Sequence, residues 1–158
     1  MRIVRRVVVI GVTLLAFAAS ATVAQGQVLR PNCSCGSFSA SGSWGWVGET
    51  TRNSGSRIWG GVKIGTIWAK NLGYGTHHVR GYSHKRWDSS RHSYKFTGSN
   101  MTVTAGGLAW VRISGTSPYV SSSAKAAVYL HGFGRYYLNS GHGNWPAFGT
   151  KYLSVREN

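Results

Sequence analysis

Acidic residues are scarce in this sequence. Its 158 residues include 18 lysines and arginines but three acids, which gives a formal net charge of +15. Glu49, Asp88 and Glu157 cannot balance so many cations, so the surface carries a positive field that attracts polyanions and weakens with salt. The shortage of acids also argues against a glycosidase, because those enzymes generally need a pair of carboxylates. Phosphate-rich partners are therefore expected, and the simpler alternative is that the charge keeps the protein soluble.

Cysteine is also rare, with Cys33 and Cys35 the two examples. Two cysteines cannot supply the disulfide framework of many small secreted folds, so a hydrophobic core has to stabilise the domain. A bridge between them would be strained because a single residue separates them. A bridge to another chain, the strained bridge and a lipid site are the alternatives. We favour an exposed N-terminal segment whose thiols serve in crosslinking.

Long hydrophobic runs are confined to the N-terminus. Three arginines precede an apolar run over residues 7–19, and small residues follow as far as Ala24. This pattern predicts a signal peptide over residues 1–24, since the run is short for a membrane span. A twin-arginine signal at Arg5 and Arg6 is the less favoured alternative. Cleavage would remove three arginines and no acid, so the secreted chain would carry a charge of +12 in place of +15.

Helical spacing of apolar residues is absent from the predicted secreted part, where apolar and polar residues alternate instead. Three stretches place apolar side chains on one parity: Ile58, Val62, Ile64 and Trp68; Met101, Val103, Ala105, Ala109, Val111 and Ile113; and Ala124, Ala126, Val128 and Leu130. Period two is typical of strands with one buried face, and Gly106-Gly107 indicates a turn or bulge. We predict an all-β fold, a single antiparallel β-sandwich or compact barrel over residues 44–158, after an irregular glycine- and serine-rich arm over 25–43.

The stretch HHVRGYSHKRWDSSRH, residues 77–92, concentrates histidine and positive charge. As a strand it would present on one face His78, Arg80, Tyr82, His84, Arg86 and Asp88. Arginine offers a planar fork of donors to phosphate, tyrosine adds a hydroxyl, and histidine adds charge as the pH falls. The predicted anion-binding residues are Arg80, Tyr82, His84, Lys85, Arg86 and Arg91. The alternative is a solvated strand face with no ligand.

A metal site and a catalytic centre are weaker interpretations of the same stretch. Its four imidazoles could bind a metal, but neighbouring cations oppose a divalent ion, so we predict no metal and no cofactor. A serine hydrolase triad would have to use Asp88, and no Gly-x-Ser-x-Gly motif occurs. A ribonuclease needs no carboxylate, so His84, His92 or His131 with Lys85 is the enzyme alternative. We assign no catalytic residue.

Trp44 and Trp46 share a strand parity and suggest a second mode of binding. Two indoles on a flat sheet can stack on sugar rings, which makes this pair the predicted sugar-stacking site. Core packing is the commoner fate of tryptophan and is the alternative.

Three short motifs give a family resemblance. They are RHSYKF at residues 91–96, AGGLAWVRISG at 105–115 and AKAAVYL at 124–130. With their surroundings, residues 82–137, they resemble the lactococcin-972-like bacteriocins. The resemblance implies a secreted, basic β-sandwich that attacks related bacteria by binding the cell-wall precursor lipid II. This chain is longer than the pattern, because residues 33–68 are unmatched and a glycine-rich tail follows the last motif.

Charge and resemblance together favour a secreted, basic antibacterial protein that binds phosphate-bearing envelope components such as lipid II. No specific nucleic-acid partner is expected, while contact with a membrane surface and a homodimer stay open. One alternative is a small secreted ribonuclease or other hydrolase of a polyanion. The other is a carbohydrate-binding or host-surface interaction module.

Overall fold

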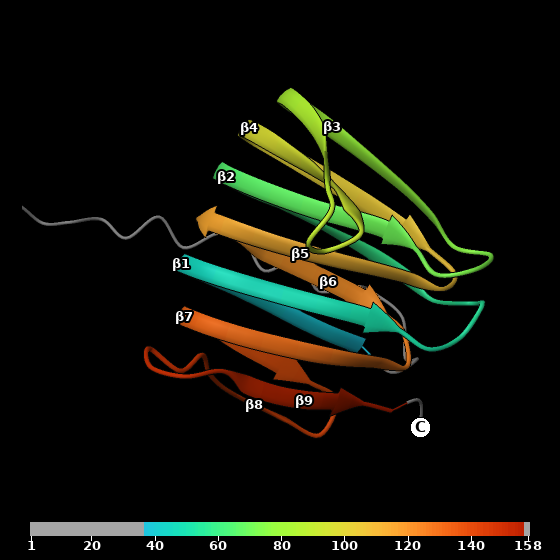
Figure 1. Cartoon of the computed structure of the whole chain (residues 1–158). Coiled ribbons are helices and arrows are strands. Elements are labelled where there is room, and N and C mark those ends of the chain that lie inside the picture. Colours follow the sequence, from blue (N-terminus) through green and yellow to red (C-terminus); the bar gives the residue numbers. More distant parts are fainter. Residues whose placement is uncertain (1–36, 157–158) are drawn as a thin grey trace, which may run out of the picture.

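The computed structural model describes residues 37–156, which form strands and no helix (Figure 1). The strands are β1 (Ser37–Thr51), β2 (Arg57–Asn71), β3 (Thr76–Asp88), β4 (Ser93–Gly106), β5 (Ala109–Thr116), β6 (Tyr119–Ser123), β7 (Ala126–Leu138), β8 (Gly141–Asn144) and β9 (Lys151–Val155). Every pairing between them is antiparallel. The predicted all-β class is therefore confirmed. The predicted signal peptide and residues 25–36 of the arm lie outside the described residues.

One sheet contains all of these strands, in the order β3-β4-β2-β5-β1-β7-β8. The short strand β5 lies between β1 and β2 and pairs with each of them. The short strand β6, which follows β5 in the sequence, also pairs with β1 and with β2. The pairing of these four strands is thus closed around the core, which makes the centre of the fold a compact barrel. At one end of the sheet, β8 and β9 pair with successive parts of β7.

A line of glycines crosses the sheet and bends its long strands. In the register, Gly98 of β4 lies opposite Gly65 of β2, which lies opposite Gly115 of β5. The line continues through Gly45 of β1 to Gly132 of β7. Gly45 and Gly132 have φ values of 131° and 121°, and a Cβ on either would collide with the backbone of the other strand. Because such a conformation and approach favour glycine, the line is where the sheet folds over itself.

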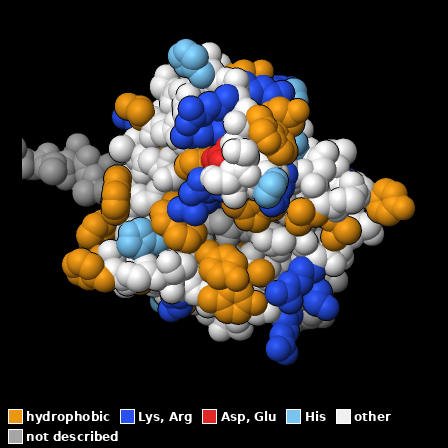
Figure 2. Space-filling view, viewed as in Figure 1, with side chains coloured by type: hydrophobic (Ala, Val, Ile, Leu, Met, Phe, Trp, Pro, Cys, Tyr) orange, Lys and Arg blue, Asp and Glu red, His pale blue; other side chains and the backbone are white. Residues whose placement is uncertain are grey.

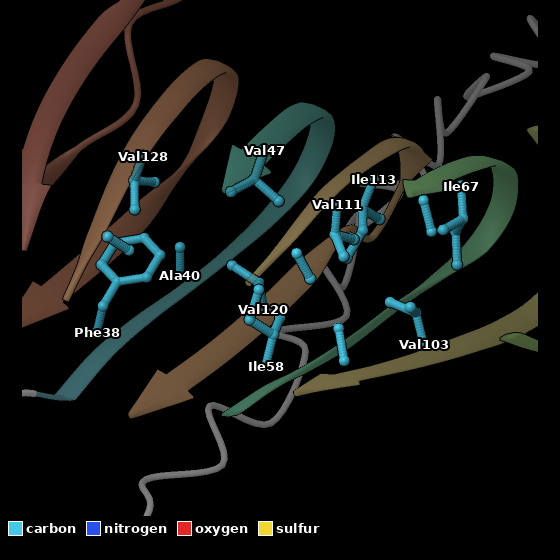
Figure 3. Packing of buried hydrophobic residues seen from close by; sticks show 14 of the residues in the cluster. Phe38, Ala40, Val47, Ile58, Ile67, Val103, Val111, Ile113, Val120 and Val128 are labelled. Atoms are coloured by element: carbon cyan, nitrogen blue, oxygen red, sulfur yellow. The ribbon is translucent and has the colours of Figure 1, made fainter. Parts of the chain in front are cut away.

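The bends divide the sheet into two layers that face each other. The front layer of Figure 1 contains β5, the second halves of β1 and β2, and the first halves of β4 and β7. The back layer contains β6 and the remaining halves. In Figure 3, side chains from both layers, such as Val47 of the front layer and Phe38 of the back layer, point into the space between the layers. This arrangement buries one face of β1, β2, β4 and β7, whereas Val79 is the one buried residue of β3.

The core confirms most of the predicted alternation. All six apolar residues predicted to be buried between Met101 and Ile113 are buried, and so are Ala124, Ala126, Val128 and Leu130. The expected interruption at Gly106-Gly107 is the end of β4 at Gly106 followed by a turn to β5 at Gly107, whose φ is 68°.

Two expectations about the strands were wrong. In β2, Ile58 and Val62 are buried, but Ile64 is 60% exposed, and Ile67 joins the core cluster. Trp68 is buried as predicted, at 9% exposure, but its ring is covered by Arg91, Lys95 and Arg112 and does not belong to that cluster. The bend at Gly65 switches the parity that faces the core, which a straight alternation cannot anticipate. The ordered part also starts earlier than Trp44, because residues 37–43 form the first half of β1. Phe38 within this half is fully buried, so it belongs to the core and not to an irregular arm.

One acid lies inside this apolar core. Glu49 of β1 is 1% exposed, and neither carboxyl oxygen has a hydrogen bond of normal geometry within the described part of the chain. Burial raises the pKa of Glu49 to about 7, and the nearby Ser122 hydroxyl opposes the rise. A carboxyl in this environment favours its protonated form, so its charge does little to offset the surface cations.

Candidate anion-binding face

The basic strand does not present one continuous face. β3 pairs with β4 alone, at the end of the sheet, and it bends at Gly81, whose φ is 77°. The register shifts twice, between Arg80 and Tyr82 and again between Tyr82 and His84. The expectation that alternate residues from His78 to Asp88 share one face is therefore wrong. The physical reason is the same as in β2: a bend with bulges changes which parity points outward.

The structure separates the six predicted anion-binding residues into three groups. Arg80 lies opposite the exposed Thr102, on the outer face of the back layer. Tyr82 and Lys85 lie beside aromatic rings at the open edge: the Tyr82 ring is 5.0 Å from that of Phe96, and Lys85 Nζ is 4.3 Å from the centre of the Tyr94 ring.

His84, Arg86 and Arg91 form the third group, associated with the outer face of the front layer. His84 lies opposite Thr97 and Arg86 opposite Lys95. Arg91 comes from the connection between β3 and β4, which lies in front of β2 and β5 in Figure 1. This outer face is where part of the predicted site meets residues that the sequence did not single out.

Asp88 fixes that connection. Its carboxylate accepts hydrogen bonds from the Ser90 hydroxyl at 2.6 Å, the Ser90 amide at 3.1 Å and the Arg91 amide at 3.3 Å. It also accepts the Trp68 indole N–H at 2.9 Å and pairs with the Arg91 guanidinium at 3.3 Å. The Ser90 hydroxyl, with the Trp68 and Arg91 donors, holds the pKa of Asp88 well below its ordinary value. The acid thus positions a turn and one arginine.

Five side chains of the front layer and its turn form a contiguous group that we call the Trp–Arg band: Trp46, Trp68, Arg91, Lys95 and Arg112. The register places Trp68 of β2 between Lys95 of β4 and Arg112 of β5. Arg112 Cζ lies 4.0 Å from the ring centre of Trp46 and 5.7 Å from that of Trp68. The Trp68 ring also has Arg91 Cζ at 5.0 Å and Lys95 Nζ at 5.4 Å. Each cation gains from the π face beneath it.

Gly48 makes room for the band. It lies opposite Arg112 in the register, and the Trp46 ring leans over it, within 3.7 Å of where a Cβ would be. The missing side chain lets the indole reach Arg112 two residues away along the sheet.

The electrostatics of the band favour an anion. Three cations surround the Trp68 indole, and Asp88 is the acid that faces them within the described part of the chain. Burial, with repulsion from Arg91, lowers the pKa of Arg112. Its Nε is buried without a hydrogen-bond partner among residues 37–156. A bound phosphate would relieve the repulsion and could accept from unpaired guanidinium donors.

Figure 2 shows this face from outside. Blue and orange side chains lie interleaved across its middle, which matches a surface of cations on aromatic rings. Lys70 extends it, since its Nζ donates to the Arg91 carbonyl at 3.2 Å and lies 5.2 Å from the Trp110 ring centre. One sequence pattern could have indicated these residues. In β5, Trp110 and Arg112 alternate with buried residues, so their side chains point to the outer face.

The predicted sugar-stacking pair is on the surface and not in the core. Trp46 is partly buried, with Arg112 on its ring and the His131 ring stacked at 6.1 Å and 29°. Trp44 is 51% exposed, and its ring centre lies 6.2 Å from that of His131 and 6.4 Å from that of Phe133. Trp46 therefore belongs to the Trp–Arg band. Of the predicted pair, Trp44 is the one whose ring is exposed to solvent.

The histidines proposed for a ribonuclease are dispersed. His84 and His131 lie on the same register row but five strand spacings apart, roughly 24 Å along the sheet. Lys85 points to the other side of β3 from His84. His131 Nδ1 donates to the Gly149 carbonyl at 2.5 Å. His92 lies in the turn fixed by Asp88, so these groups do not converge on one point.

Residues 37–156 contain no cluster of three His, Cys, Asp or Glu side chains that could hold a metal ion. They also contain no helix long and apolar enough to cross a membrane.

Comparison with known proteins identifies no relative. No protein-family model, no curated protein and no solved structure matches this chain.

Proposed function

We propose that this protein is a secreted antibacterial protein that binds phosphate-bearing components of bacterial envelopes, such as lipid II, through the Trp–Arg band. The observation that carries the proposal is the set of three cations on the Trp68 ring with one acid among them. Cations held on aromatic rings are pre-positioned, so little side-chain entropy is lost when a phosphate binds. Trp44, an exposed indole two residues from Trp46 of the band, suits the sugar rings of such a ligand.

The charge of the whole chain supports the same ligand class. The described residues contain one ion pair, Asp88–Arg91, so the other cations of residues 37–156 have no acidic partner there. Their summed field would draw an anionic polymer or headgroup towards the surface.

The family resemblance supports the choice of an envelope target. Its first motif contains Arg91 and Lys95, and its second contains Arg112. The residues that resemble the bacteriocins thus supply the three cations of the band, while its two indoles, Trp46 and Trp68, come from the unmatched residues 33–68. The outer face of the front layer, not the whole basic strand, is the surface we assign to the ligand.

The test is a titration with a water-soluble, short-chain lipid II analogue and with wall teichoic acid fragments. The double substitution Lys95→Gln/Arg112→Gln should weaken binding by tenfold or more, about 1.4 kcal/mol. The control Arg57→Gln/Lys125→Gln removes the same charge from two exposed residues outside the band and should weaken it less than about threefold.

Three outcomes would overturn the assignment. Equal weakening in both double variants would mean that binding follows net charge alone. Absence of binding to either ligand would remove its basis. Covalent cleavage of RNA or of labelled cell wall, lost in His84→Ala or His92→Ala, would identify a hydrolase instead. Growth inhibition across a panel of bacteria, measured with the secreted form, then tests the antibacterial role.

A further inference from the structure

The bent end of the sheet exposes a group of large apolar side chains. In the register, Phe133 of β7 lies opposite Trp44 of β1, and Thr116 of β5 lies between Trp44 and Ile64 of β2. Trp44 is 51% exposed, Phe133 58% and Ile64 60%. All four residues adjoin the glycine line. Because the sheet is convex where it folds, side chains pointing outward there have no neighbouring layer to cover them.

The connection between β8 and β9 adds a fourth apolar residue. Its backbone is tied to the bend in the middle of β7, since the Gly132 amide donates to the Pro146 carbonyl at 2.8 Å and His131 bonds to the Gly149 carbonyl. Phe148, within this connection, is 93% exposed. We call Trp44, Ile64, Phe133 and Phe148 the apolar crest. In Figure 2 orange side chains line the left margin, where the strands bend in Figure 1.

The surroundings of the crest carry positive charge. Lys63 precedes Ile64, Arg135 lies two residues after Phe133, and both are exposed. The two acids of the described part lie elsewhere, because Glu49 is inside the core and Asp88 is held in the turn between β3 and β4. An occupant of this end must therefore accept apolar and aromatic side chains and supply negative charge.

We propose that the apolar crest docks onto the surface of an anionic lipid bilayer. Tryptophan and phenylalanine gain free energy at the boundary between headgroups and acyl chains, and basic residues near an anionic leaflet gain further attraction. A second copy of the chain fits this end less well, because it would bring like charges together. The inference concerns a second surface and stands whether or not the Trp–Arg band binds a phosphate.

The distance between the two surfaces suits a protein that works at a membrane. Arg112 lies four residues before Thr116 on β5, so this arginine of the band is about 13 Å from the crest along the strand. With the crest in the headgroup region, which is roughly 5–8 Å deep on each side, Arg112 would stand just above the headgroups. A ligand projecting from the bilayer would reach it there.

The experiment uses the full secreted chain and vesicles of phosphatidylglycerol, with phosphatidylcholine vesicles for comparison. Sedimentation gives the bound fraction, and quenching of tryptophan fluorescence by brominated acyl chains reports insertion. The triple variant Trp44→Ser/Ile64→Ser/Phe133→Ser should bind phosphatidylglycerol at least tenfold more weakly and lose quenching. The control Trp87→Ser/Tyr129→Ser/Tyr152→Ser removes three rings exposed by 55%, 42% and 48% away from the crest and should bind within about threefold of the parent.

Several results would overturn the proposal: no binding of the parent to phosphatidylglycerol, unchanged binding of the triple variant, equal loss in both triple variants, or self-association of the parent that the crest substitutions abolish. A thermal melt identifies a variant that has failed to fold, in which case Phe148→Ser, in an exposed connection, replaces the triple variant.

The crest variant Ile64→Ser/Phe133→Ser, which keeps Trp44, should still bind the soluble lipid II analogue like the parent. Lys95→Gln/Arg112→Gln should still bind the vesicles within about threefold. The proposal for the apolar crest and the proposal for the Trp–Arg band can thus be contradicted independently of each other.

Discussion

At the scale of single residues, the two acids of the described part have opposite roles. Asp88 is ionised and holds a turn through five donor contacts, whereas Glu49 is buried without a counterion. The difference follows from environment: hydrogen-bond donors favour a charged carboxylate, and an apolar core disfavours it. Neither acid is placed to neutralise the band completely, which leaves Arg112 available to a ligand.

Glu49 predicts a stability that depends on pH. Its pKa of about 7 in the folded protein lies above the ordinary value of 4.5, so the folded state keeps a proton that the unfolded state releases. This contribution to stability is complete below pH 4.5 and is lost as the pH rises through 7, amounting to about 3 kcal/mol. Denaturant unfolding of Glu49→Gln and the parent from pH 4 to 8 should show the parent losing stability relative to the variant. Parallel curves would contradict the assignment.

Arg112 predicts that shape matters as well as charge. Arg112→Lys keeps the positive charge but loses the planar group stacked on Trp46 and its fork of donors. Binding of the lipid II analogue should weaken by about 1–2 kcal/mol, with little change in the melting temperature. Calorimetric titration measures it, with Arg57→Lys as the matched control. Full affinity in Arg112→Lys would reduce the band to a merely cationic surface.

At the scale of strands, glycine positions decide where each strand bends. The line from Gly98 to Gly132 lets five strands fold at the same level, and Gly81 bends β3 nearby. Because a bend can reverse the inward parity, Ile67 is buried while Trp68 joins the band. The position of the site is thus a consequence of the bend.

Gly132 gives the corresponding prediction. An alanine there must adopt φ 121° and would collide with the Trp44 carbonyl, so Gly132→Ala should lower the free energy of unfolding by about 2 kcal/mol or more. Gly55→Ala is the control, because its added methyl group meets nothing within 4 Å; its effect should stay within about 0.5 kcal/mol. Chemical unfolding followed by tryptophan fluorescence compares the two. Equal small effects would mean that the line tolerates side chains.

At the scale of the whole molecule, positive charge and the bent sheet act together. The fold places the band on one outer face and the apolar crest at one end. The net charge attracts anionic partners to any part of the surface, and local chemistry selects where they stay.

The dependence of binding on salt therefore separates the contribution of charge from that of local contacts. Raising NaCl from roughly 0.05 to 0.5 M should weaken binding of the lipid II analogue at least tenfold, because screening acts on the phosphate contacts. Lys95→Gln/Arg112→Gln should show a shallower dependence in the same titrations. A neutral glycan bound through Trp44 should keep its affinity, and salt-independent binding of the phosphate ligand would contradict an electrostatic site.

The sequence by itself determined the all-β class, the positive charge and much of the core. Alternation between Met101 and Ile113 predicted burial correctly, since neighbouring side chains on a strand point to opposite faces regardless of where the strand lies. Of the predicted anion-binding residues, His84, Arg86 and Arg91 lie on or beside the outer face that carries the band. Those features depend on residue type and local spacing.

Only the tertiary structure decided which residues meet. Trp46, Trp68, Lys95 and Arg112 come from four strands, and their contacts depend on the register between strands that are distant in sequence. The bends at Gly65 and Gly81 then set which parity faces outward, which separated Arg80 from Arg86 and placed the Trp68 ring under the cations of the band. Register and bending are set by packing across the whole sheet, so no local pattern contains them.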